Sequence, residues 1–294
     1  MSSLEARAAD LQTVARETVR TRRPSTFTVV RWELRKLVSQ KRSYLGTGLA
    51  ALFPLIFVIA ENLRSNPDHG GNPFIRAITE SGLAAPVVVL LWASTFLLPL
   101  TVSLVAGDIV AAEDGNGTLK TILTRSVDRG QVLAAKAITA LIYMVLVVLT
   151  MIVVGTAAGV ASWGFHQVVT FSGTTVSAPR GLLLIAAAYA FYLIPLAAVA
   201  SIGVLLSTTT KNSAAAVVGT LAFTLLLALV TLIPGLEFLH PYLLTTQFQA
   251  WQGLLATPTD WSPILHSLWV CALYAVPALI AAHLVFLRRD VAGG

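Results

Sequence analysis

Long apolar runs alternate with short polar segments along almost the whole chain. Six of these runs approach or exceed the length of about 20 residues that a helix needs to cross the hydrocarbon core of a bilayer. They cover residues 44–60, 83–106, 137–161, 181–206, 214–236 and 264–287. The pattern predicts an all-α polytopic membrane protein with six transmembrane helices.

The most strongly charged interruption, residues 107–136, separates the second apolar run from the third. Neither of these two runs contains a charged residue, whereas the segment between them contains eight. A segment with this contrast is expected to lie in water. Its residues 115–117, Gly-Asn-Gly, can end one helix, and Thr118 can then cap a short helix over residues 119–124.

This short helix is amphipathic. Leu119, Ile122 and Leu123 share one face at i, i+3, i+4 spacing, while Lys120 faces away. An isolated helix of fewer than about 12 residues is only marginally stable. We therefore expect the helix to need a surface on which to dock.

The chain before the first apolar run falls into two parts. Residues 1–25 mix charged and small residues without a stripe and are predicted to form a cytoplasmic tail. Residues 26–43 are predicted to form a basic amphipathic helix along the inner membrane surface. Its apolar positions are Phe27, Val30, Leu34 and Leu37, and its basic residues include Arg31 and Arg35. A plain juxtamembrane anchor is the alternative interpretation.

A second amphipathic segment, residues 241–257, precedes the last apolar run. Its apolar stripe consists of Leu244, Phe248, Trp251 and Leu255, opposed by three glutamines. The glutamines make another membrane crossing unfavourable, so the pattern predicts an outer interfacial or re-entrant helix. Tyr242, Trp251 and Trp261 are expected at the depth of the lipid headgroups.

Composition and charge give the orientation. Of the 294 residues, 56% are hydrophobic and 12% are charged, against roughly 25% charged in a soluble domain. With both termini in the cytoplasm, all of the 20 basic residues except Arg64, Arg76 and Arg180 lie on the inner side. The positive-inside rule thus predicts a multi-pass protein of the plasma (inner) membrane, with residues 288–294 as a cytoplasmic C-terminus. The net charge of +6 reflects this topology and does not indicate nucleic-acid binding.

Several kinds of chemistry lack their sequence motifs. The chain has no GxxxxGK[ST] motif for nucleotide phosphates and no hydrolase motif, so it is not predicted to be an enzyme or to bind a cofactor. His69, His166, His240 and His266 are scattered without the spacing of metal ligands, so no metal site is predicted. The absence of charges near the middle of the runs argues against a carrier driven by an ion gradient.

The charged segment resembles the E…GTL…LL…P-V-S-R…K pattern of the ABC type-2 permeases, the membrane subunits of ATP-binding-cassette exporters. The matching residues are Glu113, Gly117, Thr118, Leu119, Lys120, Ile122, Leu123, Arg125, Ser126, Val127, Arg129 and Lys136. Ser126 stands where the family often has proline, and Asp128 where it often has serine or threonine. The similarity extends to the six-span plan, the basic helix before the first span and the outer helix that starts at Pro241.

This resemblance implies a division of labour between subunits. Residues 119–124 would be the coupling helix, seated in a groove of a separate ABC ATPase subunit, and residues 26–43 would be the elbow helix. Two permease copies, as a homodimer or a heterodimer, would work with two ATPase copies that bind ATP and Mg²⁺. Glu113, Lys120, Arg125 and Arg129 would guide docking as charges at the rim of the contact.

The substrate path of such a permease runs between the two copies and is usually lined by the second and fifth spans. Trp92, Phe96 and Phe223 are the aromatic candidates here, and a lipid-like, drug-like or peptidic amphiphile would suit this interior. Two other readings stay open: a carrier driven by an ion gradient, and a membrane scaffold or embedded enzyme that does not transport. The spans without charges argue against the carrier, and the scaffold or enzyme would leave the short docking helix unexplained.

Overall fold

The computed structural model describes residues 25–63, 80–119 and 128–288. The predicted N-terminal tail, most of the predicted short helix at residues 119–124, and residues 289–294 lie outside the described residues. So do Lys120, Ile122, Leu123 and Arg125 among the predicted docking residues.

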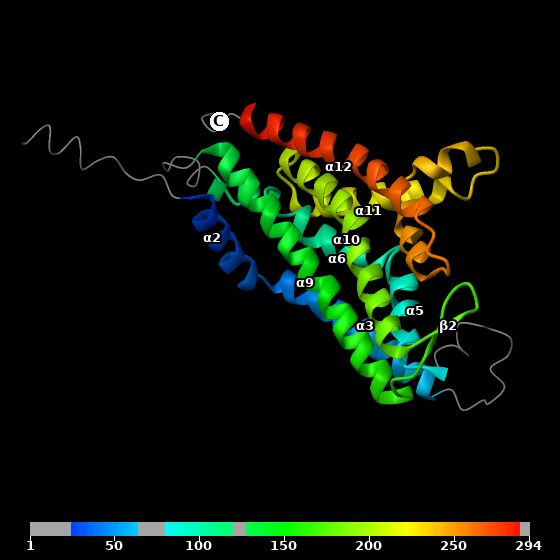
Figure 1. Ribbon diagram of the computed structural model, residues 1–294. Coiled ribbons are helices and arrows are strands. Elements are labelled where there is room, and N and C mark those ends of the chain that lie inside the picture. Colours follow the sequence, from blue (N-terminus) through cyan, green and yellow to red (C-terminus); the bar gives the residue numbers. More distant parts are fainter. Residues whose placement is uncertain (1–24, 64–79, 120–127, 289–294) are drawn as a thin grey trace, which may run out of the picture.

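The described part of the chain is almost entirely helical (Figure 1). Its α-helices are α2 (Thr26–Val38), α3 (Lys41–Leu63), α5 (Ala84–Ala93), α6 (Leu97–Ala106), α7 (Ala111–Gly115), α9 (Arg129–Trp163), α10 (Ala178–Thr209), α11 (Ser213–Val230) and α12 (Ser262–Arg288). The 3₁₀ helices η1 (Glu237–Tyr242) and η2 (Thr246–Leu255) lie between α11 and α12. A small antiparallel pair, β1 (Val168–Val169) and β2 (Thr175–Val176), joins α9 to α10, with Val168 opposite Val176.

Among the described residues, five helices are long and apolar enough to cross a membrane, namely α3, α9, α10, α11 and α12. The sixth candidate is the pair α5 and α6, which are bent by 60° relative to each other. The chain is thus an all-α polytopic membrane protein with five spans, or six if the bent pair forms one span.

The sequence predicted one continuous helix over residues 83–106, and this is wrong in the middle. The helix ends at Ala93 and begins again at Leu97. Pro99 lies in the first turn of α6, where it is tolerated because it has no N–H to donate to the preceding turn. The Tyr192 hydroxyl of α10 donates to the Ser94 carbonyl over 2.6 Å, which satisfies a backbone group at the break.

Helix α10 lies at the centre of the bundle and α11 at its edge. Half of the most apolar window of α10 is buried, against 17% in α11. Tyr189 and Tyr192 of α10 are both buried and reach the broken span, the former by donating to the Pro86 carbonyl over 2.8 Å.

The bundle has two different ends (Figure 1). Helix α2, the start of α9 and the end of α12 lie together at one of them, which we call the α2 end. The β1–β2 pair and the η helices lie at the other, which we call the η2 end. At 35 residues, α9 is roughly 50 Å long and exceeds the thickness of a bilayer core. Its surplus length provides the surface on which α2 packs.

The predicted outer helix at residues 241–257 is instead the end of η1 and the whole of η2, both of them 3₁₀ helices. The stripe of Leu244, Phe248, Trp251 and Leu255 is buried, its last three residues on η2, whereas η1 has no buried residue. Trp251 was expected at headgroup depth, but its side chain is fully buried and lies against Phe171, with ring centroids 6.1 Å apart. Protein rather than lipid surrounds this tryptophan.

Candidate functional site

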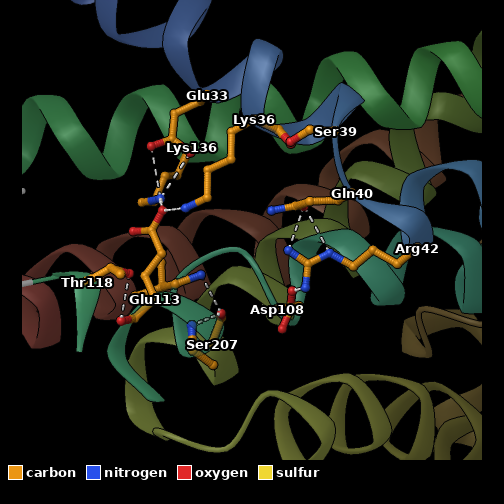
Figure 2. A network of polar contacts seen from close by, with 12 residues as sticks. Glu33, Lys36, Ser39, Gln40, Arg42, Asp108, Glu113, Thr118, Lys136 and Ser207 are labelled. Atoms are coloured by element: carbon orange, nitrogen blue, oxygen red, sulfur yellow. Dashed lines mark hydrogen bonds and ion pairs between the residues drawn. The ribbon is translucent and has the colours of Figure 1, made fainter. Parts of the chain in front are cut away.

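Charged and polar side chains gather at the α2 end, where α2, α3, α7 and α9 meet (Figure 2). Helix α2 starts at an N-cap, Ser25, whose hydroxyl accepts a hydrogen bond from the Thr28 N–H over 3.3 Å. Val29 and Val30 then pack against Ala135 of α9. This contact sets the rotation of α2 and turns Glu33 and Lys36 toward the interior of the site.

The apolar face of α2 differs from the predicted one at its first position. Phe27, Val30, Leu34 and Leu37 were expected to form a face directed at the lipid headgroups. Phe27 is 78% exposed, whereas Val29 packs against α9 with Val30 and Leu34. Val30 and Leu37 are buried and Leu34 is partly buried, as their spacing predicts. Arg31 and Arg35 are exposed. Phe27 and Trp32 are large apolar side chains of α2 that are exposed, at separate positions around the helix.

Four charges of alternating sign form the centre of the site, and we call them the charge cluster: Glu33, Lys36, Glu113 and Lys136. The Lys136 ammonium lies 3.0 Å from both carboxylate oxygens of Glu33 and 2.6 Å from Oε1 of Glu113. Lys36 also pairs with Glu113. Lys136 is fully buried and Glu113 is 3% exposed. Burying charges is unfavourable unless they are paired, and here the four sum to zero.

Asp108, in the turn after α6, organises a second group of contacts. Its carboxylate pairs with Arg42 of α3 and accepts a hydrogen bond from the Ser213 hydroxyl at the start of α11. Gln40 accepts two hydrogen bonds from Arg42, at 3.1 and 2.7 Å. This group ties together the ends of α3, α6 and α11 that lie at the α2 end.

Helix α7 receives its N-terminal cap from another helix. The Ser207 hydroxyl of α10 accepts hydrogen bonds from the backbone N–H groups of Val110 and Ala111, both at 2.9 Å. Free N–H groups in the first turn of a helix are usually capped by a local side chain, but α7 lacks such a residue. The short helix that carries Glu113 is thereby held by α10.

A cavity of about 260 Å³ lies beside these contacts. Charged residues of both groups line it, namely Glu33, Lys36, Arg42 and Glu113, together with apolar residues such as Leu37 and Ile109. The second carboxylate oxygen of Glu113 is buried and accepts no hydrogen bond from the described residues. The cavity has room for water beside this oxygen.

Two of the predicted docking residues are buried within the protein. Glu113 was expected at the rim of a contact with a partner, but it belongs to the buried charge cluster. Leu119 is 3% exposed and packs in the main hydrophobic core, so its side chain is covered by this chain itself. Both corrections have one cause: the hydrophobic and charged positions of a loop do not reveal which surface of its own chain they meet.

The other described docking residues lie near the surface. Gly117 has a φ of +70°, a conformation that favours glycine, as expected where one helix ends and another begins. The hydroxyl of Thr118 donates to the Glu113 carbonyl over 3.2 Å. Arg129 starts α9 and donates to the Leu287 carbonyl at the end of α12 over 3.1 Å.

The three aromatic residues expected along a substrate path do not form one cluster. Trp92 lies at the end of α5 and Phe96 in the break before α6, and they are 67% and 46% exposed. Phe223 of α11 instead packs edge-to-face against Tyr274 of α12, with ring centroids 6.3 Å apart.

The sequence interpretation did not assign Glu33, Lys36, Asp108 or Ser207 to a site. One signal was present: Glu33 and Lys36 are spaced i, i+3 on the helix face that also carries Val30 and Leu37. Charges on the inward side of an amphipathic helix indicate partners within the protein.

No curated protein matches the chain. A family model described as "Protein of unknown function (DUF2705)" matches residues 49–292, which include every membrane-span candidate except the start of α3. The chain with this bundle and buried charge cluster therefore belongs to the DUF2705 family.

Proposed function

We propose that this chain is the membrane-spanning permease subunit of an ATP-binding-cassette exporter. It would form the substrate path as a dimer, and a separate ATPase subunit, which binds ATP and Mg²⁺, would dock on the loop between the second and third spans. The resemblance of residues 113–136 to the ABC type-2 permeases supports this proposal. The observation that carries it furthest is the charge cluster, which joins this loop to α2 and α9.

The charge cluster suits the transmission of force. A push on the loop would act on α7 and on the start of α9, which carry Glu113 and Lys136. Separating these residues would leave buried charges unpaired, at a cost of roughly 3–5 kcal/mol for a broken pair. The loop, α2 and the inner ends of the spans would therefore move together and bias the bundle between two states.

The docking face follows from the burial of Leu119. Because this side chain is enclosed by its own chain, we assign docking to Ile122 and Leu123, with Lys120, Arg125 and Arg129 as surrounding charges. Such an arrangement places a small apolar contact inside a basic rim, and rim charges affect association rate and specificity more than affinity.

Affinity purification of the intact chain in mild detergent, with mass spectrometry and an ATPase assay, tests the proposal. The variant Ile122→Asp/Leu123→Asp should lose the ATPase that copurifies with the wild-type chain, because two charges would enter an apolar contact. The variant Phe165→Asp is the matched control. It replaces a residue that is 46% exposed at the η2 end, so it should retain the partner.

Both variants must first insert and elute like the wild type in size-exclusion chromatography. If no ATPase accompanies the wild-type chain from its native membrane, the permease proposal is wrong. Transport that follows an ion gradient would then favour a carrier, and no transport would favour a scaffold.

A further inference from the structure

A second pocket opens at the η2 end, between η2 and the first turns of α12. Its volume is about 420 Å³, and it is open to the surface. Its polar lining comes from Thr246, Gln247 and Gln249 of η2 and from Asp260, Ser262 and His266 at the start of α12. This pocket is separate from the charge cluster, which lies at the opposite end of the bundle.

Several hydrogen-bond donors of this lining are already used within the protein. The side-chain N–H₂ group of Gln247 donates to the carbonyls of Pro241 and Leu243, at 2.8 and 3.2 Å. Two carbonyl partners fix the orientation of the amide, because only its nitrogen can donate. The nitrogen of Gln249 donates to the Ser94 hydroxyl over 3.1 Å.

The ring of His266 also donates a hydrogen bond to a backbone carbonyl. Its Nε2 lies 2.8 Å from the Pro241 carbonyl, which can only accept a hydrogen bond. The neutral ring therefore carries its proton on Nε2, and Nδ1 is left as an acceptor.

What remains for a ligand is a set of acceptors, the hydroxyl groups of Thr246 and Ser262, which can donate or accept, and one negative charge. The amide oxygen of Gln247 takes no part in the two hydrogen bonds that the amide nitrogen donates. The amide oxygen of Gln249 accepts one hydrogen bond, from Gln252 over 2.7 Å, and has capacity for a second. Asp260 accepts one hydrogen bond, from the Ser262 N–H over 3.0 Å, through a single carboxylate oxygen. Of the described residues that line the pocket, Asp260 is the one charged at neutral pH.

From this complementarity we propose that the pocket binds an organic ammonium ion, with its N–H groups directed to Asp260 and to the glutamine oxygens. The rings of His266, Trp269 and Tyr242 pack together beside it, with centroids 5.0 Å apart between His266 and Trp269 and 6.2 Å between His266 and Tyr242. Trp269 and Tyr242 are 45% and 50% exposed. Aromatic faces attract cations and cover the apolar part of an organic amine.

A bare metal ion fits the pocket less well. Hard cations need about six oxygen ligands within roughly 2.6 Å, and usually several carboxylates. One carboxylate in a space of about 420 Å³ does not supply this shell, whereas an amine with an attached carbon chain fills the space. The inference concerns this chain alone and does not depend on an ATPase partner.

Calorimetry on the full chain in nanodiscs of zwitterionic lipid tests the proposal, with n-hexylammonium as the probe. Three comparisons define the site. The neutral analogue 1-hexanol should give no saturable binding, and tetraethylammonium, which has no N–H group, should bind more weakly than n-hexylammonium. The variant Asp260→Asn should weaken binding by roughly 2- to 5-fold, because an ion pair with an exposed carboxylate is lost.

The variant Glu237→Gln provides the matched control. Glu237 is an exposed carboxylate on η1 that does not line the pocket, so its change should leave the affinity unaltered. The amide oxygen introduced by Asp260→Asn can still accept the Ser262 N–H, and an unchanged melting temperature would show that the start of α12 is intact. Equal affinity in the wild type and in Asp260→Asn, or equal affinity for n-hexylammonium and 1-hexanol, would overturn the proposal.

Discussion

Lys136 is fully buried at the α2 end, with its ammonium group 3.0 Å from both oxygens of Glu33 and 2.6 Å from Glu113. A buried ammonium group is tolerated only because these carboxylates compensate it. The carboxylates depend equally on the lysine, since Lys36 alone remains to pair with Glu113. The contribution of each residue is therefore a property of the cluster.

We expect Lys136→Met to destabilise the protein by about 3–5 kcal/mol, because it leaves the buried carboxylate of Glu113 and the partly buried carboxylate of Glu33 with one cation. A denaturant titration of the protein in detergent measures the change in the free energy of unfolding. The double variant Glu33→Gln/Lys136→Met should recover part of the loss, since it restores a balanced pair of Lys36 and Glu113. Such a recovery is the signature of coupled residues in a double-mutant cycle.

Arg31→Ala is the matched control for this change. Arg31 lies on the exposed side of α2, and surface substitutions usually alter stability by less than about 0.5 kcal/mol. A cost for Lys136→Met that is no larger than the cost for Arg31→Ala would contradict the buried charge cluster.

At the scale of elements, the start of the broken span meets α9 at two glycines. A Cβ atom added at Gly159 of α9 would collide with the backbone at Gly82, and one added at Gly82 would collide with the backbone at Gly159. Gly155, one turn earlier, has more room: its added Cβ would lie 3.4 Å from the nearest atom, in Pro54. Gly155 and Gly159, which form a GxxxG motif on α9, therefore have different roles.

Gly159→Ala should destabilise the protein by about 1–3 kcal/mol, because the helices must separate to admit a methyl group. Gly155→Ala should change stability by less than about 1 kcal/mol, because the better helix propensity of alanine offsets a tight but permitted contact. The melting temperatures of the two variants in one detergent give the comparison. Equal effects would indicate that α5 and α9 are not in contact at Gly159.

At the scale of the whole molecule, the orientation in the membrane remains a prediction from the distribution of basic residues. The chain offers a direct measurement, because its single cysteine, Cys271, is buried. In a Cys271→Ala background, a cysteine can be placed at either end of the bundle. Phe27 at the α2 end and Trp261 at the η2 end are suitable sites, with exposed fractions of 78% and 58%.

With both termini in the cytoplasm, Trp261→Cys should react with a membrane-impermeant maleimide in intact cells. Phe27→Cys should react only after the membrane is permeabilised. The Cys271→Ala parent, without an added cysteine, measures background labelling. The reverse pattern would show that the positive-inside prediction is wrong for this protein, and would place the pocket between η2 and α12 on the cytoplasmic side.

Much of the architecture could be predicted from local sequence. The apolar runs predicted membrane spans, because a helix that meets lipid must be apolar along its whole length. The stripe from Leu244 to Leu255 predicted which side of that segment is covered, although not that protein covers it. The helix-breaking residues 115–117 predicted the end of one helix and the positive φ of Gly117. Each of these features depends on neighbours within a few turns of the same segment.

Only the tertiary structure decided which segments meet. The break at residues 94–96 accompanies a hydroxyl from Tyr192, about 100 residues away. The burial of Glu113 between Lys36 and Lys136 also depends on residues distant in the sequence, as does the burial of Leu119 within the core. The alternation of apolar and polar residues shows that a side chain has a covered face, but the identity of the covering group depends on long-range packing. The sequence alone thus determined a multi-span helical membrane protein with a charged loop, and the packing of the bundle determined where its charges and its pockets lie.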